Sequence, residues 1–517
     1  MPPPRATPPS PPRRPPPEFF HARWWFSRLL GIVYLAAFGA LLPQLAGLLG
    51  PSGLEPAIPP LRVLGRHGGP LALLAMPSLL WLDPDFVFLA TLCAGGVAAA
   101  LLLLSNTAPR LAAAACWCLY LSVVAVGRDF FAYQWDALLL EAGFLAVFLA
   151  PGGLLPGKYR HAPSSWAFVG LGRLLLVKLL LGSALGKLLN GDPAWREGTA
   201  LNFFFETQPL PTALAWWAHH LPSAALHAAT RLTVLVELLA PLLIFGPRRL
   251  RPWVAGGYLL WFALVSLTGN HAFLPLLAMA LCLLLVEDAA WPGRRRKPGA
   301  PHPAAAARAR GKPWWRLVAH GAVVAVMALL SLTAGLRPFL PGGGKALGPV
   351  DALLTVTAPF RVFNRYGMFT TITRRRREIV IEGSLDGDHW TPYEFRWKPG
   401  VVFRAPGFVA PFQPRLDWQM WFAALTPYAD DPWFDRLLDR LLTGDPAVLN
   451  LLGRNPFPLW PPREVRAVLY EYHFTSPEER RRTGNWWWRK RVGLYAPPRS
   501  LPPDEQPPAL PPGVIRT

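Results

Sequence analysis

The chain has 517 residues, of which 52% are apolar, and its mean hydropathy is +0.25. This hydropathy is high for a soluble protein and ordinary for a membrane protein, so the composition argues against a purely soluble fold. The net charge is +21. Because most of the excess lies in short segments beside apolar runs, we expect no nucleic-acid partner.

Long apolar runs follow one another through the first 340 residues. Several reach the ~20 residues that a helix needs to cross a ~30 Å hydrocarbon core, and a soluble domain has no use for nine of them. We therefore predict a multi-pass α-helical membrane bundle of about nine spans. The runs are Leu29–Leu49, Phe86–Leu104, Leu111–Val126, Ala137–Ala150, Trp166–Leu189, Leu232–Phe245, Trp253–Leu267, Ala272–Val286 and Leu317–Leu336.

The basic residues predict the orientation of this bundle. If the N-terminus is cytoplasmic and every run spans, the cytoplasmic segments carry 18 Lys and Arg residues and the external segments carry 4. Basic residues accumulate on the cytoplasmic side of membranes, so the region after the last span is predicted to be extracytoplasmic. The cytoplasmic segments are 1–28, 105–110, 151–165, 247–252 and 288–315. The external segments are 50–85, 127–136, 190–228 and 268–271.

Composition divides the chain into five parts. Residues 1–20 form a Pro- and Arg-rich arm that we predict to be disordered and cytoplasmic, and the long apolar run behind it is read as a signal anchor. The transmembrane bundle occupies 21–337 and is followed by a Pro/Gly hinge at 338–349. A polar domain at 350–498 and a Pro-rich tail at 499–517 complete the chain.

The polar domain has the patterns of a small α+β fold. Glu378–Ser384 alternates like a strand, Leu385–Asp388 has turn chemistry, Thr391–Lys398 is predicted to be the returning strand, and Val465–Phe474 alternates again. We therefore expect a β-hairpin or sandwich core. Helices are predicted at Asp417–Leu425, Trp433–Leu442 and Asp445–Leu452. All four cysteines lie in apolar runs, so no disulfide is expected in this domain.

Irregular stretches spread over nearly the whole chain resemble the lipase maturation factors and their bacterial relatives. They are Tyr133–Phe144, Gly191–Arg196, Glu206–Pro211, Thr268–Asn270, Asn364–Gly367, Glu382–Ser384, Pro414–Ala424, Asn455–Phe457 and Gly484–Trp487. One departure is Phe204-Phe205, where the family pattern has a His-Tyr pair, so a role that needs this histidine is not supported.

The resemblance implies a location and a role. Lipase maturation factors are endoplasmic-reticulum membrane proteins that secreted lipases need to reach their active state. By resemblance, this chain lies in that membrane, or in the cytoplasmic (inner) membrane of a bacterium. It is expected to act as a membrane-anchored folding or assembly factor, with membrane lipids and secreted or membrane client proteins as partners and no cofactor.

The stretch Gly191–Pro211 is the first candidate functional loop because polar groups and aromatic residues alternate in it. One interpretation is an interfacial loop whose Trp195, with Trp216 and Trp217, lies at headgroup depth. The other is a functional cap over a cavity in the bundle. The candidate residues are Asp192, Trp195, Arg196, Glu206, Thr207, Gln208 and Pro209.

Five ionisable residues lie inside predicted spans, where charges are costly and usually paired. We expect Glu141 or Glu237 to pair with Arg173 or Lys178. Lys187, near the external end of its helix, either snorkels to the interface or acts as a base. The second alternative follows from a distant similarity of 181–195 to the vitamin K-dependent γ-carboxylases, in which a lysine at this place is the catalytic base.

The sequence contains no motif of a soluble enzyme and no His/Cys metal spacing, and the adjacent His219 and His220 would point to different helix faces. We therefore expect binding rather than catalysis, with the Lys187 enzyme as the alternative. A transporter is not indicated, because no internal repeat is present. The candidate client surface is Asn364, Trp418, Trp421, Phe422, Trp486 and Trp487. For Trp418–Phe422 the alternative is a helix buried in the domain's own core.

Overall fold

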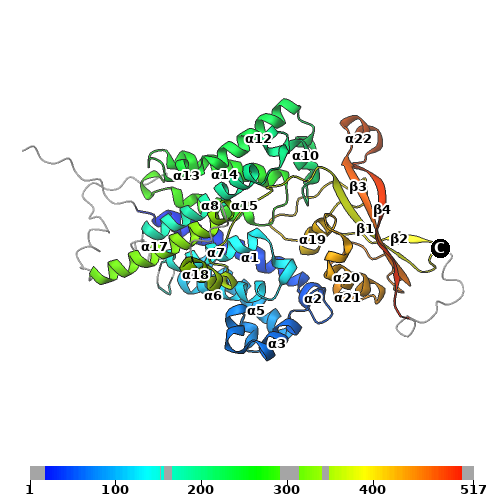
Figure 1. Ribbon diagram of the computed structural model, residues 1–517, viewed down its shortest axis with the longest axis horizontal. Helices are drawn as coiled ribbons and strands as arrows, with labels where there is room; N and C mark the ends of the chain where they lie inside the picture. Colours follow the sequence, from blue (N-terminus) through cyan, green and yellow to red (C-terminus); the bar gives the residue numbers. More distant parts are fainter. Residues whose placement is uncertain (1–17, 152, 156–165, 292–313, 341–347, 503–517) are drawn as a thin grey trace, which may run out of the picture.

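The structure is a computed structural model, and it describes residues 18–151, 153–155, 166–291, 314–340 and 348–502. Most of the predicted N-terminal arm, hinge and C-terminal tail lies outside the described residues. A helical bundle forms one half of the molecule, and a region built on a β-sheet forms the other (Figure 1).

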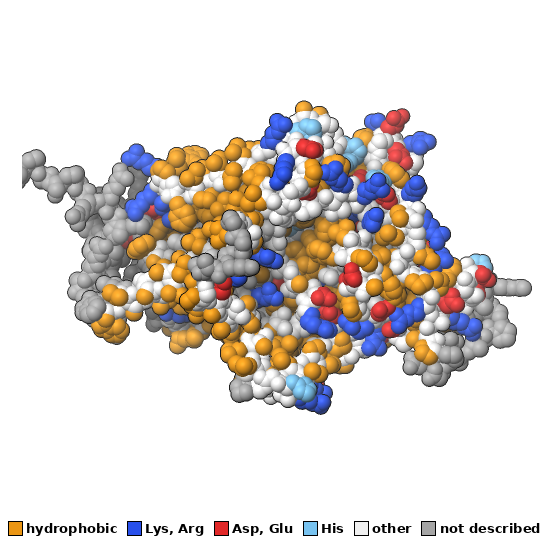
Figure 2. All heavy atoms as spheres, in the orientation of Figure 1, with side chains coloured by type: hydrophobic (Ala, Val, Ile, Leu, Met, Phe, Trp, Pro, Cys, Tyr) orange, Lys and Arg blue, Asp and Glu red, His pale blue; other side chains and the backbone are white. Residues whose placement is uncertain are grey.

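Helices of the bundle coincide with the apolar runs of the sequence. The longer ones are α1 (Phe20–Leu41), α5 (Phe86–Ser105), α6 (Pro109–Val124), α7 (Gln134–Leu149), α8 (Trp166–Leu189), α12 (Ser223–Leu238), α14 (Arg251–Thr268) and α17 (Trp314–Leu336). Shorter ones are α2 (Leu45–Leu49), α3 (Ile58–His67), α4 (Ala72–Ala75), α9 (Pro193–Glu197), α10 (Ala200–Thr207), α11 (Ala213–His219), α13 (Ala240–Phe245) and α15 (Leu274–Cys282). Hydrophobic side chains cover much of this half (Figure 2).

The prediction of about nine spans is wrong by helix length and composition. Within the described residues, four helices are long and apolar enough to cross a membrane. Apolar runs do not equal helices here. Pro241 in the first turn of α13 divides the run Leu232–Phe245 into two helices, and α6, α7 and α15 are shorter than the ~20 residues that a span needs. The four candidate spans are Phe20–Leu49, Phe86–Ser105, Trp166–Leu189 and Val318–Phe339.

The segments that connect these helices fall into two groups, one at each end of the bundle. At one end, Arg23 donates to the carbonyl of Leu149 at 2.5 Å and Arg110 to that of Ala150 at 3.2 Å, while Asp288 accepts from the backbone of Phe20 at 2.9 Å. The connections at the other end contact the C-terminal region. The first group falls in or directly beside segments predicted to be cytoplasmic, and the second belongs to those predicted to be external.

The C-terminal region contains a four-stranded antiparallel sheet with the order β2-β1-β3-β4. Its strands are β1 (Arg376–Ser384), β2 (Trp390–Pro392), β3 (Glu464–Phe474) and β4 (Trp487–Ser500). The predicted hairpin is confirmed, since Ser384 pairs with Trp390, although β2 is shorter than the predicted return. Gly387 has a φ of +86° in the turn, which favours glycine there.

Helices cover one face of this sheet and join it to the bundle. They are α19 (Arg415–Ala423), α20 (Pro432–Leu442) and α21 (Pro446–Leu449), while α22 (Pro477–Thr483) connects β3 to β4 and α18 (Gly348–Thr357) follows α17. Trp433 of α20 is fully buried and meets the ring of Phe130 edge-on at 5.5 Å. One hydrophobic core therefore runs from the bundle into the C-terminal region.

Candidate functional site

The deepest contact between the bundle and the C-terminal region is an ion pair between α7 and α19. The guanidinium nitrogens of Arg415 lie 2.9 Å from both carboxylate oxygens of Asp136, and neither side chain is more than 1% exposed. Tyr120 donates a hydrogen bond to the same carboxylate, and Arg415 donates to the carbonyl of Phe130 at 2.6 Å. Removing either partner would leave the other charge buried without compensation, so the pair holds α19 against α7.

A second arginine, Arg376 at the start of β1, binds the candidate loop through its backbone. It donates to the carbonyl oxygens of Glu206 at 2.7 Å, Gln208 at 2.5 Å and Pro209 at 2.8 Å. Its charge is balanced by Glu378, 2.6 Å away, and the Arg376 side chain is fully buried. A guanidinium has enough donors in a fixed plane for this arrangement, which fixes the loop against the sheet.

The carboxylate of Glu206 holds the end of β3. It accepts from the backbone N–H of Phe474 at 2.8 Å and lies 3.1 Å from Nδ1 of His473. This contact raises the pKa of His473. His219 of α11 lies 3.9 Å from the same carboxylate, and burial lowers the pKa of His219.

Asn270, between α14 and α15, connects three segments with one side chain. Its Oδ1 accepts from the N–H groups of Val409 at 2.7 Å and Ala410 at 3.1 Å, and its Nδ2 donates to the carbonyls of Gly407 at 2.8 Å and Leu210 at 3.1 Å. The oxygen of the amide accepts two hydrogen bonds and its nitrogen donates two, so the buried side chain of Asn270 joins the bundle to the C-terminal region.

The loop after α8 is bound by the chain that leads into β1. Asp192 caps α9 at the N–H of Ala194 (2.9 Å) and accepts from the N–H of Ile372 (2.5 Å). The indole of Trp195 donates to the carbonyl of Phe369 at 2.9 Å. With Glu206, Thr207, Gln208 and Pro209 also buried, the predicted functional loop is mostly covered by the C-terminal region.

The tryptophans near this loop differ in burial. Trp195 and Trp216 are 5% and 1% exposed, so they pack against protein and not against lipid headgroups, whereas Trp217 is 57% exposed. Arg196 is exposed and donates to the carbonyl of Leu188 at 3.2 Å. Aromatic side chains were read as interfacial because the sequence did not show that a second domain packs on them.

The ionisable residues of the bundle pair in part as predicted. Lys178 lies 2.5 Å from Glu141, as expected. Glu237 instead binds Lys187, whose Nζ is 2.6 Å from both of its carboxylate oxygens, and Arg173 donates to the carbonyl of Leu284 at 3.0 Å. Lys187 is buried and does not snorkel, because an acceptor is present on the neighbouring helix α12.

The predicted client surface is not one exposed patch. Trp418 and Trp487 are buried, Trp421 and Trp486 are half-buried, and Phe422 is exposed. Asn364 is turned toward the bundle, where its backbone and side chain donate to Glu141 at 3.1 and 3.2 Å. Residues Trp418–Phe422 thus belong to a packed helix, as the alternative interpretation expected. Trp421 of this helix donates to the carbonyl of Thr207 at 2.8 Å.

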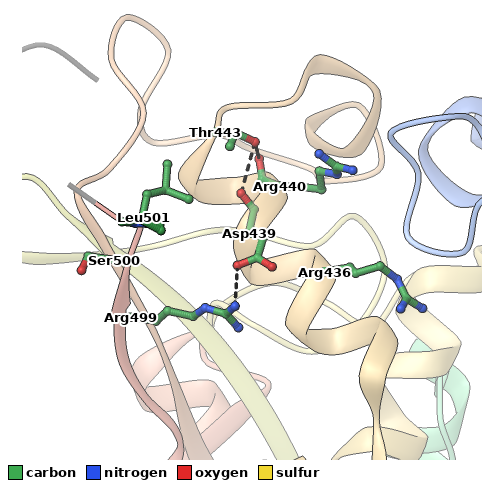
Figure 3. A pocket seen from close by; sticks show the side chains of 8 residues that line it. Arg436, Asp439, Arg440, Thr443, Arg499, Ser500 and Leu501 are labelled. Carbon is green, nitrogen blue, oxygen red and sulfur yellow. Dashed lines mark hydrogen bonds and ion pairs between the residues drawn. The ribbon is translucent and has the colours of Figure 1, made fainter. Parts of the chain in front are cut away.

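A pocket of about 370 Å³ lies where α20 meets the end of β4, with Arg436, Asp439 and Arg499 among its lining residues (Figure 3). Two of its arginines are paired with carboxylates, since Arg499 lies 2.9 Å from Asp439 and Arg436 lies 3.8 Å from Glu55. Among the described residues, no group of three or more His, Cys, Asp or Glu side chains is arranged to hold a metal ion.

Comparison with known proteins decides the family. The family model of the lipase maturation factor transmembrane domain matches residues 21–293, and that of the lipase maturation factor C-terminal domain matches residues 362–497. The chain belongs to the lipase maturation factor family. It is 34% identical to lipase maturation factor 1 of Bos taurus, over 92% of this chain and 88% of that protein. It is also 34% identical to lipase maturation factor 2 of Homo sapiens, over 92% of this chain and 82% of that protein. No solved structure matches the chain.

The stretches that carry the resemblance to lipase maturation factors meet at this junction. Asp136 contacts Arg415, Glu141 contacts Asn364, and Asp192 contacts the chain beyond Tyr366, so motifs of the two domains contact each other. Sequence reasoning missed Arg376, Arg415 as a charge partner, and Glu237 as the partner of Lys187. For Arg415 the sequence offered no signal of its partner, because Asp136 lies 279 residues away in the chain.

Proposed function

We propose that this chain is a membrane-anchored maturation factor for lipases or similar secreted proteins, and that it acts by binding them rather than by a chemical step. Its relatives are named for that role. The observation that supports a binding mode is an exposed aromatic loop on the C-terminal region, defined as residues 397–408. Exposed apolar surface on a folded domain is typical of protein interaction sites.

Three aromatic side chains of the aromatic loop are exposed. Phe403 is 66% exposed, Phe408 58% and Trp397 38%, although none is needed to fill the core. The loop is nevertheless fixed in place: the N–H of Trp397 donates to Asp417 at 2.8 Å, and Arg404 donates to the carbonyls of Phe395 and Lys398 at 2.9 and 2.8 Å. A rigid loop that presents apolar rings loses little entropy when it binds the apolar surface of an immature client.

The same proposal places the C-terminal region outside the cytoplasm. Support comes from the contacts, which group segments 127–136, 190–228 and 268–271 with that region, at the end of the bundle opposite to the contacts of Arg23 and Arg110. We expect an Asn-x-Ser acceptor inserted beside Leu459, which is 84% exposed, to be glycosylated in endoplasmic-reticulum membranes. An acceptor that stays unmodified in a folded chain would contradict this orientation.

The enzymatic alternative through Lys187 gains no support from the geometry. Its ammonium is paired with both oxygens of Glu237 and lies 4.9 Å from the ring of Trp195. This arrangement gives Lys187 a structural role in joining α8 and α12, which is enough to account for its burial.

Client binding is tested by removing the apolar rings of the aromatic loop. In cells that lack their own maturation factor, the double variant Phe403→Ser/Phe408→Ser is expected to lose most rescue of secreted lipase activity while its own abundance stays normal. Leu459→Ser is the matched control, since it removes an even more exposed apolar side chain elsewhere on the same region. Full rescue by the double variant would show that the client binds elsewhere.

A further inference from the structure

The segment that follows α17 does not lie with the sheet. Helix α18 packs beside α17 against the bundle (Figure 1). Asp351 in its first turn lies 3.0 Å from Arg337, at the end of the candidate span Val318–Phe339. Helix α18 therefore begins at the level where α17 leaves the membrane.

The chain beyond α18 lies below that level. The backbone N–H of Asn364 donates to Glu141 at 3.1 Å, and the hydroxyl of Tyr366 donates to the same carboxylate at 2.8 Å. Glu141 is seven residues into α7, about 10 Å from its first residue. Its partner Lys178 is halfway along the candidate span α8.

From Asn364 the chain returns to the end that carries the C-terminal region. Its backbone groups are satisfied on the way, as Gln134 binds both the N–H (3.0 Å) and the carbonyl (2.9 Å) of Gly367, and Ser183 accepts from Met368 at 3.2 Å. Ile372 then reaches Asp192. Non-helical backbone at membrane depth is tolerated only when protein groups or water satisfy it in this way.

Two glycines on α8 leave room for this returning chain. A Cβ at Gly182 would lie 2.4 Å from the carbonyl oxygen of Tyr366, and one at Gly186 would lie 2.3 Å from the Cγ2 of Thr370. Glycines four residues apart on one helix face allow close backbone approach, as they do between helices in membranes. The returning chain therefore packs directly on a candidate span.

The outer face of α18 is apolar. Leu353 and Val356 are 49% and 57% exposed, and the neighbouring exposed positions are Ala352, Thr355 and Ala358. The exposed Arg361 and Arg365 follow the helix, where the chain turns back toward the C-terminal region.

We infer that residues 348–372 form a re-entrant membrane element: α18 enters the leaflet beside α17 with its outer face against lipid acyl chains, and 361–372 returns between α7 and α8. The occupant is lipid because the apolar face of α18 continues that of α17, where Leu329 and Leu332 are 51% and 41% exposed. The helix would descend about 14 Å between Asp351 and Phe360, roughly half of the hydrocarbon core.

Single cysteines test this element in native membranes opened on both sides. The background carries Cys118→Ala, since Cys93, Cys116 and Cys282 are buried. Leu353→Cys and Val356→Cys are the test variants, Leu329→Cys is the lipid reference and Leu459→Cys is the water reference. All four replace exposed side chains, so folding is preserved and is checked by the thermal midpoint.

We expect both test cysteines to react with a polar maleimide at the rate of Leu329→Cys, more than about tenfold slower than Leu459→Cys, because a thiol in lipid is rarely a thiolate. We also expect a phospholipid with a photoreactive acyl chain to crosslink to positions 353 and 356. Labelling as fast as Leu459→Cys would overturn the inference. Slow labelling without a lipid adduct, but with disulfide-linked dimers through position 353, would overturn it in favour of a second copy of the chain.

Discussion

The C-terminal region docks on the bundle through two groups of contacts, and these differ in their chemistry. On the α19 side, Arg415 and Asp136 are excluded from solvent and locked together with Tyr120. On the β3 side, Glu206 binds His473, whose side chain is 27% exposed and titratable. The first side resembles the interior of a domain, and the second resembles an adjustable contact. The difference suggests that docking depends on the α19 side, while the β3 side modulates it.

The largest effect is expected from Arg415→Met, which leaves Asp136 buried without its partner. Breaking a buried pair in this way costs about 3–5 kcal/mol, and the loss is measured as the change in unfolding midpoint in lipid nanodiscs. The control is Arg415→Met/Asp136→Asn, which removes both charges and is expected to recover part of the loss. A double variant no more stable than the single one would show that the pair itself is not what holds α19.

Asn270→Ala comes next because it leaves the N–H groups of Val409 and Ala410 without an acceptor. Each unsatisfied buried group costs about 1–3 kcal/mol, so we expect faster hydrogen exchange at 409–410 along with lower stability. Asn202→Ala, at a half-buried amide with one long contact of 3.4 Å to His227, is the matched control. Equal effects of the two variants would argue against a special role for Asn270.

Gly269→Ala is expected to have a moderate effect on the same side. Its Cβ would lie 2.1 Å from Oε1 of Gln208 and 2.5 Å from Nε2 of His271, so these two side chains have to shift, and the hydrogen bond from Gln208 to the carbonyl of Thr268 is disturbed. Overpacking of this kind costs about 1–3 kcal/mol. Gly257→Ala in α14 has open space around it and is expected to be neutral or slightly stabilising. Thermal midpoints that fall equally in both variants would contradict the crowding seen here.

The smallest effect is expected from pH at the β3 side. The contact with Glu206 raises the pKa of His473, so its contribution to docking is complete below the unfolded value of ~6.5 and is lost as pH rises through the raised pKa. Glu471, 3.2 Å from His473, acts in the same direction. His219 acts oppositely below ~6.5, because burial lowers its pKa.

Limited proteolysis of the sheet region between pH 6 and 8.5 measures this contribution. We expect release to increase with pH in the natural chain and to become nearly flat in His473→Gln, whereas His67→Gln, at an exposed position on α3, keeps the natural profile. An unchanged profile in His473→Gln would assign the pH dependence to other groups.

Local patterns predicted the elements, whereas the contacts between distant segments were mostly not predicted, with the pair of Glu141 and Lys178 as an exception. Alternation in Glu378–Ser384 predicted β1, and the apolar runs predicted the bundle helices, because these signals depend on neighbours in sequence. Arg415 and Asp136 are 279 residues apart, and nothing in either segment identifies the other. The count of spans failed because an apolar run shows which residues a segment can bury but not whether its helix is long enough to cross a membrane.

The separation of Arg415 and Asp136 along the chain also sets a delay during protein synthesis. At about 5–20 residues per second, the ribosome needs roughly 15 to 55 s after Asp136 to make the 279 residues that lead to its partner. During that interval the nascent bundle holds a carboxyl group that its finished fold buries against a cation. A chain that stops short of Arg415 never supplies this cation, so premature termination anywhere before it is expected to give a product that cellular quality control recognises by its membrane part.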